Sequence, residues 1–202
     1  MNRPLVVGVG GTTRQNSSSE QALRVALSHA EANGAETLAF CGADLIFPMY
    51  GAGEAGRSPQ ATRFIEAIRR ADGVIIASPG YHGSVSGLLK NALDYLEDLR
   101  DDPAPYLDGR AVGCIVSAWG PQALGATLSA LRAIIHALRG WPTPMAAAFS
   151  AVTPAFDAAG RCADEALDRQ LAIVASQVVE FAEMRALRRN AAAPSALRLA
   201  CA

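Results

Sequence analysis

Short apolar runs alternate with amphipathic segments five times along the chain, and this alternation restricts the fold more than any other feature. The runs are rich in β-branched residues, as expected of strands buried on both faces, whereas the segments between them place apolar residues at helical spacing. The expected strands are 5–9, 37–40, 73–78, 111–117 and a weaker 145–149, and the expected helices are 19–33, 58–71, 86–99, 121–138 and 163–184. Such alternation predicts a parallel sheet with helices on both faces.

Five strands connected in this way favour the doubly wound order 2-1-3-4-5. In that order ligands bind beyond the carboxyl ends of the strands, beside the switch between the first and third strands. The loops after Val9, Ser78 and Ser117 are therefore the places to look for chemistry. Residues 1–184 are expected to form one domain, and residues 185–202, rich in alanine and arginine, a flexible tail. The stretch 42–58, with several glycines, is expected to be a long loop.

The composition excludes several classes of function. The 202 residues include 18 Lys or Arg and 19 Asp or Glu, so the formal net charge is -1 and no nucleic-acid or membrane-surface partner is indicated. Neither a transmembrane run nor a secretory leader is visible in the sequence. The four cysteines are far apart and lack metal-ligand spacing: Cys41, Cys114, Cys162 and Cys201. We expect a reduced, cytoplasmic, soluble protein with no metal site.

The loop after the first strand is rich in hydroxyl groups and leads into a helix. It reads Gly-Gly-Thr-Thr-Arg-Gln-Asn-Ser-Ser-Ser over residues 10–19. Hydroxyls and free amides at a helix N-terminus form a phosphate cradle, to which Arg14 adds a cation. A P-loop would need Gly-Lys-Ser/Thr, but the only lysine is Lys90, and the dinucleotide pattern GxGxxG fails at Thr13. A phosphate site without either motif favours a mononucleotide, and flavin mononucleotide (FMN) is the usual one in this architecture.

The loop after the third strand carries the most specific motif. From residue 78 the chain reads Ser-Pro-Gly-Tyr-His-Gly-Ser-Val-Ser-Gly-Leu-Leu-Lys-Asn. This resembles the segment Pro-x-Tyr-(Asn/His/Lys)-x-Ser-x-x-Gly-x-(Leu/Phe)-Lys-Asn of the NAD(P)H-dependent FMN reductase family. The first loop is similar to that family's Gly-Ser-x-Arg-x-x-Ser-x-Asn, with Thr12 for serine and Ser19 for asparagine. The resemblance spans about residues 4 to 150 and implies a flavodoxin-like three-layer sandwich.

The resemblance also implies roles for individual residues. The FMN phosphate would be held in the loop after the first strand by Thr12, Arg14, Ser17 and Ser19. The isoalloxazine ring would be lined by the loop after the third strand, whose backbone amides can donate to it: Pro79, Gly80, Tyr81, His82, Gly83 and Ser84. The ring's pyrimidine edge would meet the loop after the fourth strand, at Ser117, Trp119 and Gly120. Hydride transfer needs no strong acid or base, so His82 is expected beside the ring edge or the phosphate, with a role as catalytic acid as the weaker alternative. Many family members carry glutamate where this chain has Gly80.

The implied activity is an NAD(P)H-dependent FMN reductase, in which hydride passes from NADH or NADPH to flavin N5. The reduced flavin would then serve a monooxygenase or another acceptor. Two alternatives stay open: a quinone, azo or oxyanion reductase that contains FMN, and a non-catalytic flavodoxin-like electron carrier. Such carriers are usually strongly acidic, so the net charge of -1 argues against the second. A homodimer or homotetramer is expected, and Arg57 and Arg110 are the cations considered for the extra phosphate of NADPH.

Overall fold

The computed structural model describes residues 3–53 and 56–198 and contains one sheet of five parallel strands. The strands are β1 (Leu5–Gly10), β2 (Glu36–Phe40), β3 (Gly73–Pro79), β4 (Ala111–Ala118) and β5 (Trp141–Ser150). Their order across the sheet is β2-β1-β3-β4-β5, so the predicted order 2-1-3-4-5 is confirmed. Val, Ile and Ala fill β3 and β4 because both faces of these strands are covered.

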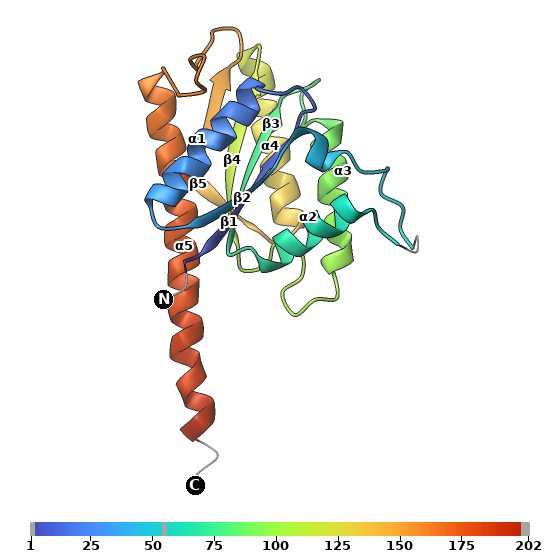
Figure 1. The fold of residues 1–202 in the computed structure, drawn as a ribbon, viewed down its shortest axis with the longest axis vertical. Helices are drawn as coiled ribbons and strands as arrows, with labels where there is room; N and C mark the ends of the chain where they lie inside the picture. Colours follow the sequence, from blue (N-terminus) through green and yellow to red (C-terminus); the bar gives the residue numbers. More distant parts are fainter. Residues whose placement is uncertain (1–2, 54–55, 199–202) are drawn as a thin grey trace.

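The helices form a layer on each face of this sheet (Figure 1). Helices α1 (Ser18–Ala32) and α5 (Glu165–Arg198) cover one face. The other face is covered by α2 (Pro59–Arg70), α3 (Gly87–Asp94) and α4 (Pro121–Ala137), together with a 3-10 segment, η2 (Tyr95–Leu99), that continues α3. Each face has its own apolar core, and the flavodoxin-like three-layer sandwich expected from the sequence is confirmed.

Caps and proline positions explain where the helices begin. Ser17, Ser58 and Ser86 are the N-caps of α1, α2 and α3, and each side chain accepts a hydrogen bond from an amide of the first turn. Pro59 and Pro121 occupy the first positions of α2 and α4, where the missing amide costs nothing. The carboxyl ends of β1, β3 and β4 therefore lead into short loops of fixed shape.

Strand β5 is longer than the sequence predicts and begins at Trp141 rather than Met145. Pro142 and Pro144 made the beginning of this strand hard to recognise, because proline cannot donate to a central ladder. Since β5 lies at the edge of the sheet, both prolines are tolerated there. Trp141 is exposed and packs against Phe181 of α5, with 5.6 Å between the ring centroids.

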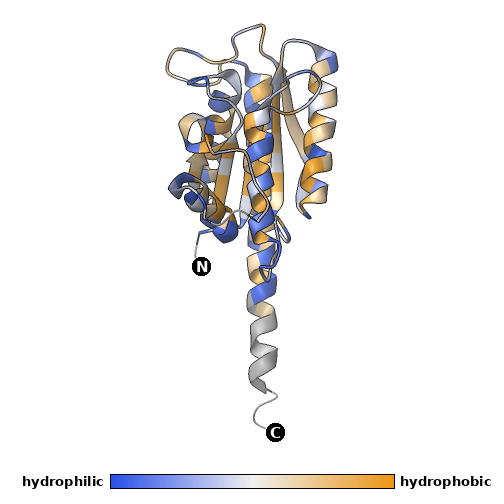
Figure 2. Cartoon of the chain, turned by 90° about the vertical axis from the view of Figure 1, so that its right-hand side faces the viewer, coloured by the Kyte–Doolittle hydropathy of each residue, from blue (hydrophilic) through white to orange (hydrophobic). Residues whose placement is uncertain are grey.

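Helix α5 also differs from the prediction. The sequence places its end near Met184 and a flexible tail from residue 185, but the helix continues to Arg198; residues 199–202 lie outside the described ranges. Among the side chains that the structure describes, the last buried one is Ala182, and the helix then runs on beyond the sheet (Figures 1 and 2). The first part of the extension still contacts the domain, because the guanidinium of Arg189 lies 3.0 Å from the carboxylate of Asp72.

Candidate functional site

Three hydrogen bonds join the ends of β1 and β3 to each other and to the start of α3. The Gly11 amide donates to the Ala77 carbonyl at 2.8 Å, and the Ser86 hydroxyl donates to the Gly11 carbonyl. The Ser86 amide in turn donates to the Ser78 hydroxyl at 3.1 Å. A Cβ on Gly11 would lie 2.8 Å from the Cβ of Leu89, so only glycine allows this close approach. Sequence reasoning missed the roles of Ser78 and Ser86.

The first loop presents hydroxyls and unpartnered amides at the N-terminus of α1. The Ser17 hydroxyl accepts from the Glu20 amide at 3.3 Å and lies 3.3 Å from the Ser19 hydroxyl, while Thr12 Oγ1 accepts from the Arg14 amide at 3.2 Å. Within the described ranges, no acceptor is found for the amides of residues 17–19 or for the guanidinium of Arg14. These free donors sit at the positive end of the helix dipole, which is the arrangement that binds anions.

The loop after β3 is a tight two-residue hairpin turn. Tyr81 and Ser84 exchange backbone hydrogen bonds of 2.9 and 3.1 Å, and the two residues between them, His82 and Gly83, have φ angles of 51° and 83°. This matches a type I′ turn, which needs two left-handed residues. His82 is exposed at the tip of the turn, and among the described residues its ring has no hydrogen-bond partner.

The hairpin corrects one detail of the sequence analysis, which expected the backbone amides of this whole loop to be available to a ligand. The Gly80 amide donates to the Ser117 carbonyl at 2.8 Å, and the amides of Tyr81 and Ser84 are used within the turn. In the part of the chain that the structure describes, the amides of His82 and Gly83 have no protein acceptor. The number of free donors is therefore smaller than expected.

Gly80 is packed against α4 and β4. A Cβ at this position would lie 2.7 Å from Thr127 Oγ1 and 3.1 Å from the Cβ of Ala118. The glutamate that many family members carry here would need these neighbours to move. The site has no carboxylate at this position.

Strand β4 ends beside the same hairpin and continues into the third loop. Ser117 and Ala118 are buried, whereas Trp119 is 80% exposed. The Ala118 carbonyl accepts from the Ala151 amide at 2.8 Å, which ties the loop after β5 to the end of β4. Gly120 is the N-cap of α4 and contributes no side chain.

A cleft of about 110 Å³ joins these three loops at the carboxyl ends of β1, β3 and β4. Most of the sequence-predicted site residues line it, together with three that were not predicted: Ser18, Ala118 and Ala151. The predicted members of the lining are Thr12, Arg14, Ser17, Ser19, Pro79, Gly80, Tyr81, Ser117 and Trp119. Four predicted residues are not in the lining: His82, Gly83, Ser84 and Gly120.

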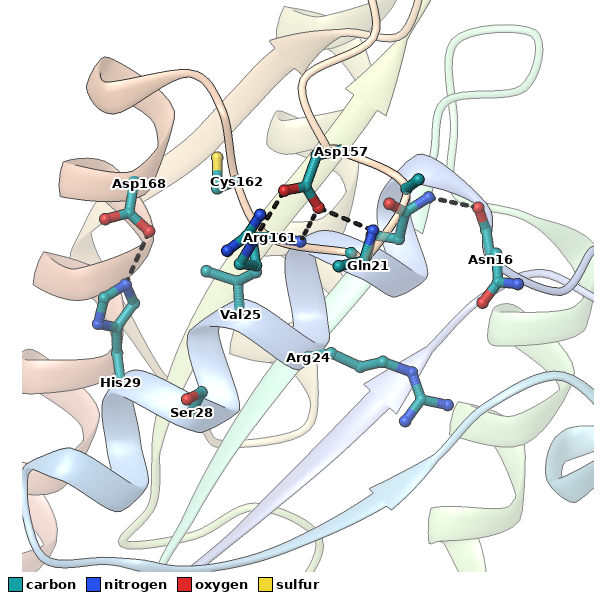
Figure 3. Close-up of a pocket in the computed structure, with 13 residues that line it drawn as sticks. Asn16, Gln21, Arg24, Val25, Ser28, His29, Asp157, Arg161, Cys162 and Asp168 are labelled. Atoms are coloured by element: carbon teal, nitrogen blue, oxygen red, sulfur yellow. Dashed lines mark hydrogen bonds and ion pairs between the residues drawn. The ribbon is translucent and has the colours of Figure 1, made fainter.

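A larger hollow of about 750 Å³ lies along α1, between that helix and the loop before α5 (Figure 3). None of the predicted site residues lines it. Its charges are largely paired with one another: Arg161 lies 2.8 Å from Asp157, and His29 lies 2.9 Å from Asp168. The smaller cleft is the better candidate site, because it combines unpaired donors with the end of the sheet where this fold binds ligands.

The loop between β2 and α2 is held against α3 rather than standing free. Asn91, which is 6% exposed, accepts from the Tyr50 amide and donates to the Pro48 carbonyl, both at 2.9 Å. The Tyr95 hydroxyl donates to the same Pro48 carbonyl at 3.0 Å. The expectation of a long irregular segment holds only in part, because Gly42–Leu45 forms a 3-10 turn, η1.

The two arginines considered for the extra phosphate of NADPH are both engaged elsewhere. Arg57 forms two hydrogen bonds of 2.7 and 2.9 Å with Asp98, which raise the pKa of the guanidinium and lower the pKa of the carboxyl. Arg110 is buried at the amino end of β4 and donates to backbone carbonyls, including those of Ala71 and Arg69 at 2.8 Å. Burial lowers the pKa of Arg110, and its position away from the cleft argues against a role in binding.

Three cysteines lie among the described residues, Cys41, Cys114 and Cys162, and burial raises the pKa of each thiol. Burial raises the pKa of Cys114 in β4 to about 12 and that of Cys41, after β2, to about 11. Cys201 lies outside the described residues. Among the residues that the structure describes, no cluster of three or more His, Cys, Asp or Glu could hold a metal ion. Within the same residues, no helix is both long and apolar enough to cross a membrane.

Curated relatives share either most of the chain or one part of it. An NAD(P)H-dependent FMN reductase of Pseudomonas aeruginosa is 32% identical over 167 residues, which cover 79% of this chain and 85% of that protein. An FMN-dependent NADPH-azoreductase of Staphylococcus haemolyticus is 37% identical over 81 residues. That match covers 40% of this chain and spans only 39% of the azoreductase.

Solved structures and a family model agree with the architecture. The flavoenzyme NAD(P)H:(acceptor) oxidoreductase FerB of Paracoccus denitrificans is 20% identical, covers 90% of this chain and 98% of its own, and superposes with a TM-score of 0.70. At that identity the likeness supports the fold alone. The family model described as NADPH-dependent FMN reductase matches residues 4–154, about three quarters of the chain. The loops after β1, β3 and β4 all lie within this match, and the chain belongs to the NADPH-dependent FMN reductase family.

Proposed function

We propose that the chain is an NAD(P)H-dependent FMN reductase whose cofactor binds in the cleft between the loops after β1, β3 and β4. One observation carries the proposal: Arg14 and residues 17–19, whose guanidinium and amides have no acceptor among the described residues, line the same cleft as Gly80 and Tyr81 of the loop after β3. Family membership supports the same conclusion. The relative from P. aeruginosa, named an NAD(P)H-dependent FMN reductase, supports the choice of substrates.

The donors of the first loop suit a phosphate group. Thr12, Ser17 and Ser19 supply hydroxyls, the amides of residues 17–19 have no protein acceptor among the described residues, and Arg14 supplies a positive charge. Charge-assisted bonds from such donors to a phosphate are about twice as strong as neutral hydrogen bonds. In this proposal the cradle binds the flavin through its phosphate and fixes the depth at which the molecule enters the cleft.

The second and third loops suit a flat ring. Gly80 has no side chain, and it lines the cleft together with the exposed rings of Tyr81 and Trp119. The amides of His82 and Gly83 have no protein acceptor among the described residues, and we propose that they contact the ring's polar edge. Bound FMN supplies a ring that accepts two electrons as hydride from a nicotinamide dinucleotide. The protein's part is to bind, orient and shield that ring, and no side chain is needed as a strong acid or base.

The proposal is tested by measuring oxidation of NADH and of NADPH at 340 nm by the purified protein, with and without added FMN. We expect FMN-dependent oxidation of at least one of the two dinucleotides. Protein that neither binds FMN nor oxidises either dinucleotide in its presence would sink the proposal. Because Arg57 and Arg110 are both engaged by other protein groups, neither is proposed to select NADPH over NADH.

A second candidate function, an FMN-containing quinone or azo reductase, is favoured by the exposed aromatic rings at the cleft. Trp119 is 80% exposed and Tyr81 is 54% exposed, although large apolar side chains usually lie inside. Two such rings beside the cleft would suit a flat aromatic acceptor. Rapid-mixing oxidation of the reduced protein separates the candidates: reoxidation by a quinone much faster than release of FMN would favour this one.

Further features of the proposal concern partners and location. We propose a cytoplasmic homodimer or homotetramer that acts on small molecules and passes reduced flavin to a monooxygenase or to a second small acceptor. Sedimentation of the purified protein measures the oligomeric state. The electron-carrier alternative is disfavoured by the net charge of -1, and failure of a bound flavin to react with either dinucleotide would revive it.

A further inference from the structure

An acidic side chain lies directly beneath the proposed phosphate cradle. Glu20, in the first turn of α1, is 7% exposed. Its Oε2 accepts from the Asn16 amide at 3.1 Å, and its Oε1 accepts from Arg24 Nη2 at 2.7 Å and from Arg24 Nε at 3.2 Å. A carboxylate so close to an anion site would repel the ligand unless its charge is balanced by a neighbouring cation.

The hydrogen bond from Asn16 is not the one that this sequence pattern predicts. Ser17 and Glu20 have the spacing of a capping box, in which the glutamate accepts from the amide of the N-cap residue itself. Here Glu20 accepts from Asn16, one residue earlier, although the Ser17 hydroxyl still caps the Glu20 amide at 3.3 Å. The Ser17 amide, which an ordinary capping box would use, is left without an acceptor in the described part of the chain.

Asn16 is held in an uncommon backbone conformation by two side chains of the same helix turn. Its φ angle is 53°, in the left-handed region that residues other than glycine rarely occupy. Its amide donates to Glu20, and its carbonyl accepts from Gln21 Nε2 at 2.6 Å (Figure 3). The first loop therefore enters the helix through a backbone turn that Glu20 and Gln21 hold from both sides.

The charge of Glu20 is balanced by its own helix. Arg24 lies one turn further on, and its guanidinium forms two hydrogen bonds to the Glu20 carboxylate. The pair carries no net charge, which reduces the repulsion that a phosphate in the cradle would feel. Glu20 can then act on the loop through its hydrogen bond without strongly opposing an anion.

We propose that Glu20 is a positioning residue for the flavin phosphate: by holding Asn16 in its left-handed turn, it keeps the amides of residues 17–19 free and aimed into the cleft. The inference rests on the proposed function, because it concerns the group that the cradle binds. Glu20 does not touch the phosphate in this proposal. Its effect reaches the ligand through the backbone of the loop and is specific for a phosphomonoester over an alcohol.

The test compares FMN with riboflavin, which has the same ring and ribityl chain but no phosphate. Dissociation constants for both are measured by quenching of flavin fluorescence, for the wild-type chain and for the variants Glu20→Ala, Glu20→Gln and Arg24→Ala. Glu20→Ala removes the acceptor of the Asn16 amide, and we expect FMN to bind about tenfold more weakly or worse, while riboflavin changes by less than about twofold. Glu20→Gln keeps an oxygen acceptor and is expected to bind FMN within about threefold of the wild type.

Arg24→Ala keeps the hydrogen bond from the Asn16 amide to Glu20 but leaves the Glu20 charge unbalanced, so we expect FMN to bind up to about threefold more weakly, a smaller loss than in Glu20→Ala. A loss as large as that of Glu20→Ala would assign the effect to the ion pair and overturn the inference. An unchanged ratio of FMN to riboflavin affinity in Glu20→Ala, or an equal loss of both ligands, would also overturn it. Wild-type protein that fails to bind FMN at all would instead refute the proposed function.

Discussion

The hydrogen bonds by which Asn91 of α3 holds the loop between β2 and α2 can be tested quantitatively. Replacing Asn91 by alanine removes both hydrogen bonds that hold this loop: the bond from the Tyr50 amide and the bond to the Pro48 carbonyl, each 2.9 Å long. The two losses are not equal. The Pro48 carbonyl keeps the hydroxyl of Tyr95 as a donor at 3.0 Å, whereas the Tyr50 amide loses its acceptor.

The magnitude follows from this difference. A partly buried amide left without an acceptor costs about 1–3 kcal/mol, and a hydrogen bond whose carbonyl retains another donor contributes less than about 1 kcal/mol. We therefore expect the free energy of unfolding to fall by about 2 kcal/mol in Asn91→Ala. For a domain of this size that corresponds to a decrease in Tm of about 4–8 °C.

Thermal unfolding followed by circular dichroism provides the assay, and the neighbouring residue provides the matched control. The ammonium of Lys90 lies 2.5 Å from Asp94, but the two side chains are 49% and 43% exposed, so Lys90→Ala should cost less than about 0.5 kcal/mol. A Tm for Asn91→Ala within about 1 °C of the wild type, or an equal loss in Lys90→Ala, would refute the reasoning.

Three further predictions concern the site and the core. Gly80→Ala places a Cβ 2.7 Å from Thr127 Oγ1 and should cost about 1–3 kcal/mol in urea unfolding, whereas Gly87→Ala, with nothing within 4 Å, should not; equal effects would contradict the packing argument. Arg14→Gln should weaken binding of FMN by about tenfold or more and leave riboflavin unchanged, as measured by fluorescence titration, and a parallel loss of both would place Arg14 away from the phosphate. Burial raises the pKa of Cys114 to about 12, so its folded pKa exceeds the unfolded value. The stability it contributes is complete below about pH 8.5 and falls as the pH rises toward 12, and Cys114→Ala should show a shallower loss of Tm over that interval than the wild type; identical slopes would count against this.

The sequence predicted the sheet well because its signals are local. β3 and β4 are continuous apolar runs, and alternation with helices then restricts the order of the strands. The two elements that differed lie where local signals weaken. β5 begins with prolines that an edge strand tolerates, and α5 continues past Ala182, beyond which the side chains described, residues 183–189 and 191, are not buried and do not maintain the apolar period.

The candidate site was predicted in its residue types more than in its hydrogen bonds. The side chains of Thr12, Arg14 and Ser17 could be chosen from the sequence because hydroxyls and cations before a helix are a visible pattern. Which acceptor a backbone amide uses leaves no such pattern in the sequence. That the Gly80 amide is used by Ser117 follows from the pairing of loops far apart in the chain, which the sequence does not reveal.

Glu20 shows where a signal existed and was missed. The spacing of Ser17 and Glu20 is a capping-box pattern and could have drawn attention to the carboxylate. Its partner, however, is Asn16 rather than Ser17, and this shift depends on the left-handed turn at Asn16. The two hydrogen bonds between Asn91 and the loop after β2 could not be predicted either, because partners more than forty residues apart leave no local pattern in the sequence.

The central claim is that the loops after β1, β3 and β4 form one site that binds FMN by its phosphate. The measurement that tests it most directly is a titration of the wild-type protein with FMN and with riboflavin under the same conditions. We predict that FMN binds at least about tenfold more tightly than riboflavin, because only FMN carries a phosphate to engage Arg14 and the amides of residues 17–19, which have no acceptor among the described residues. Equal affinity for the two flavins, or no binding of either, would contradict it.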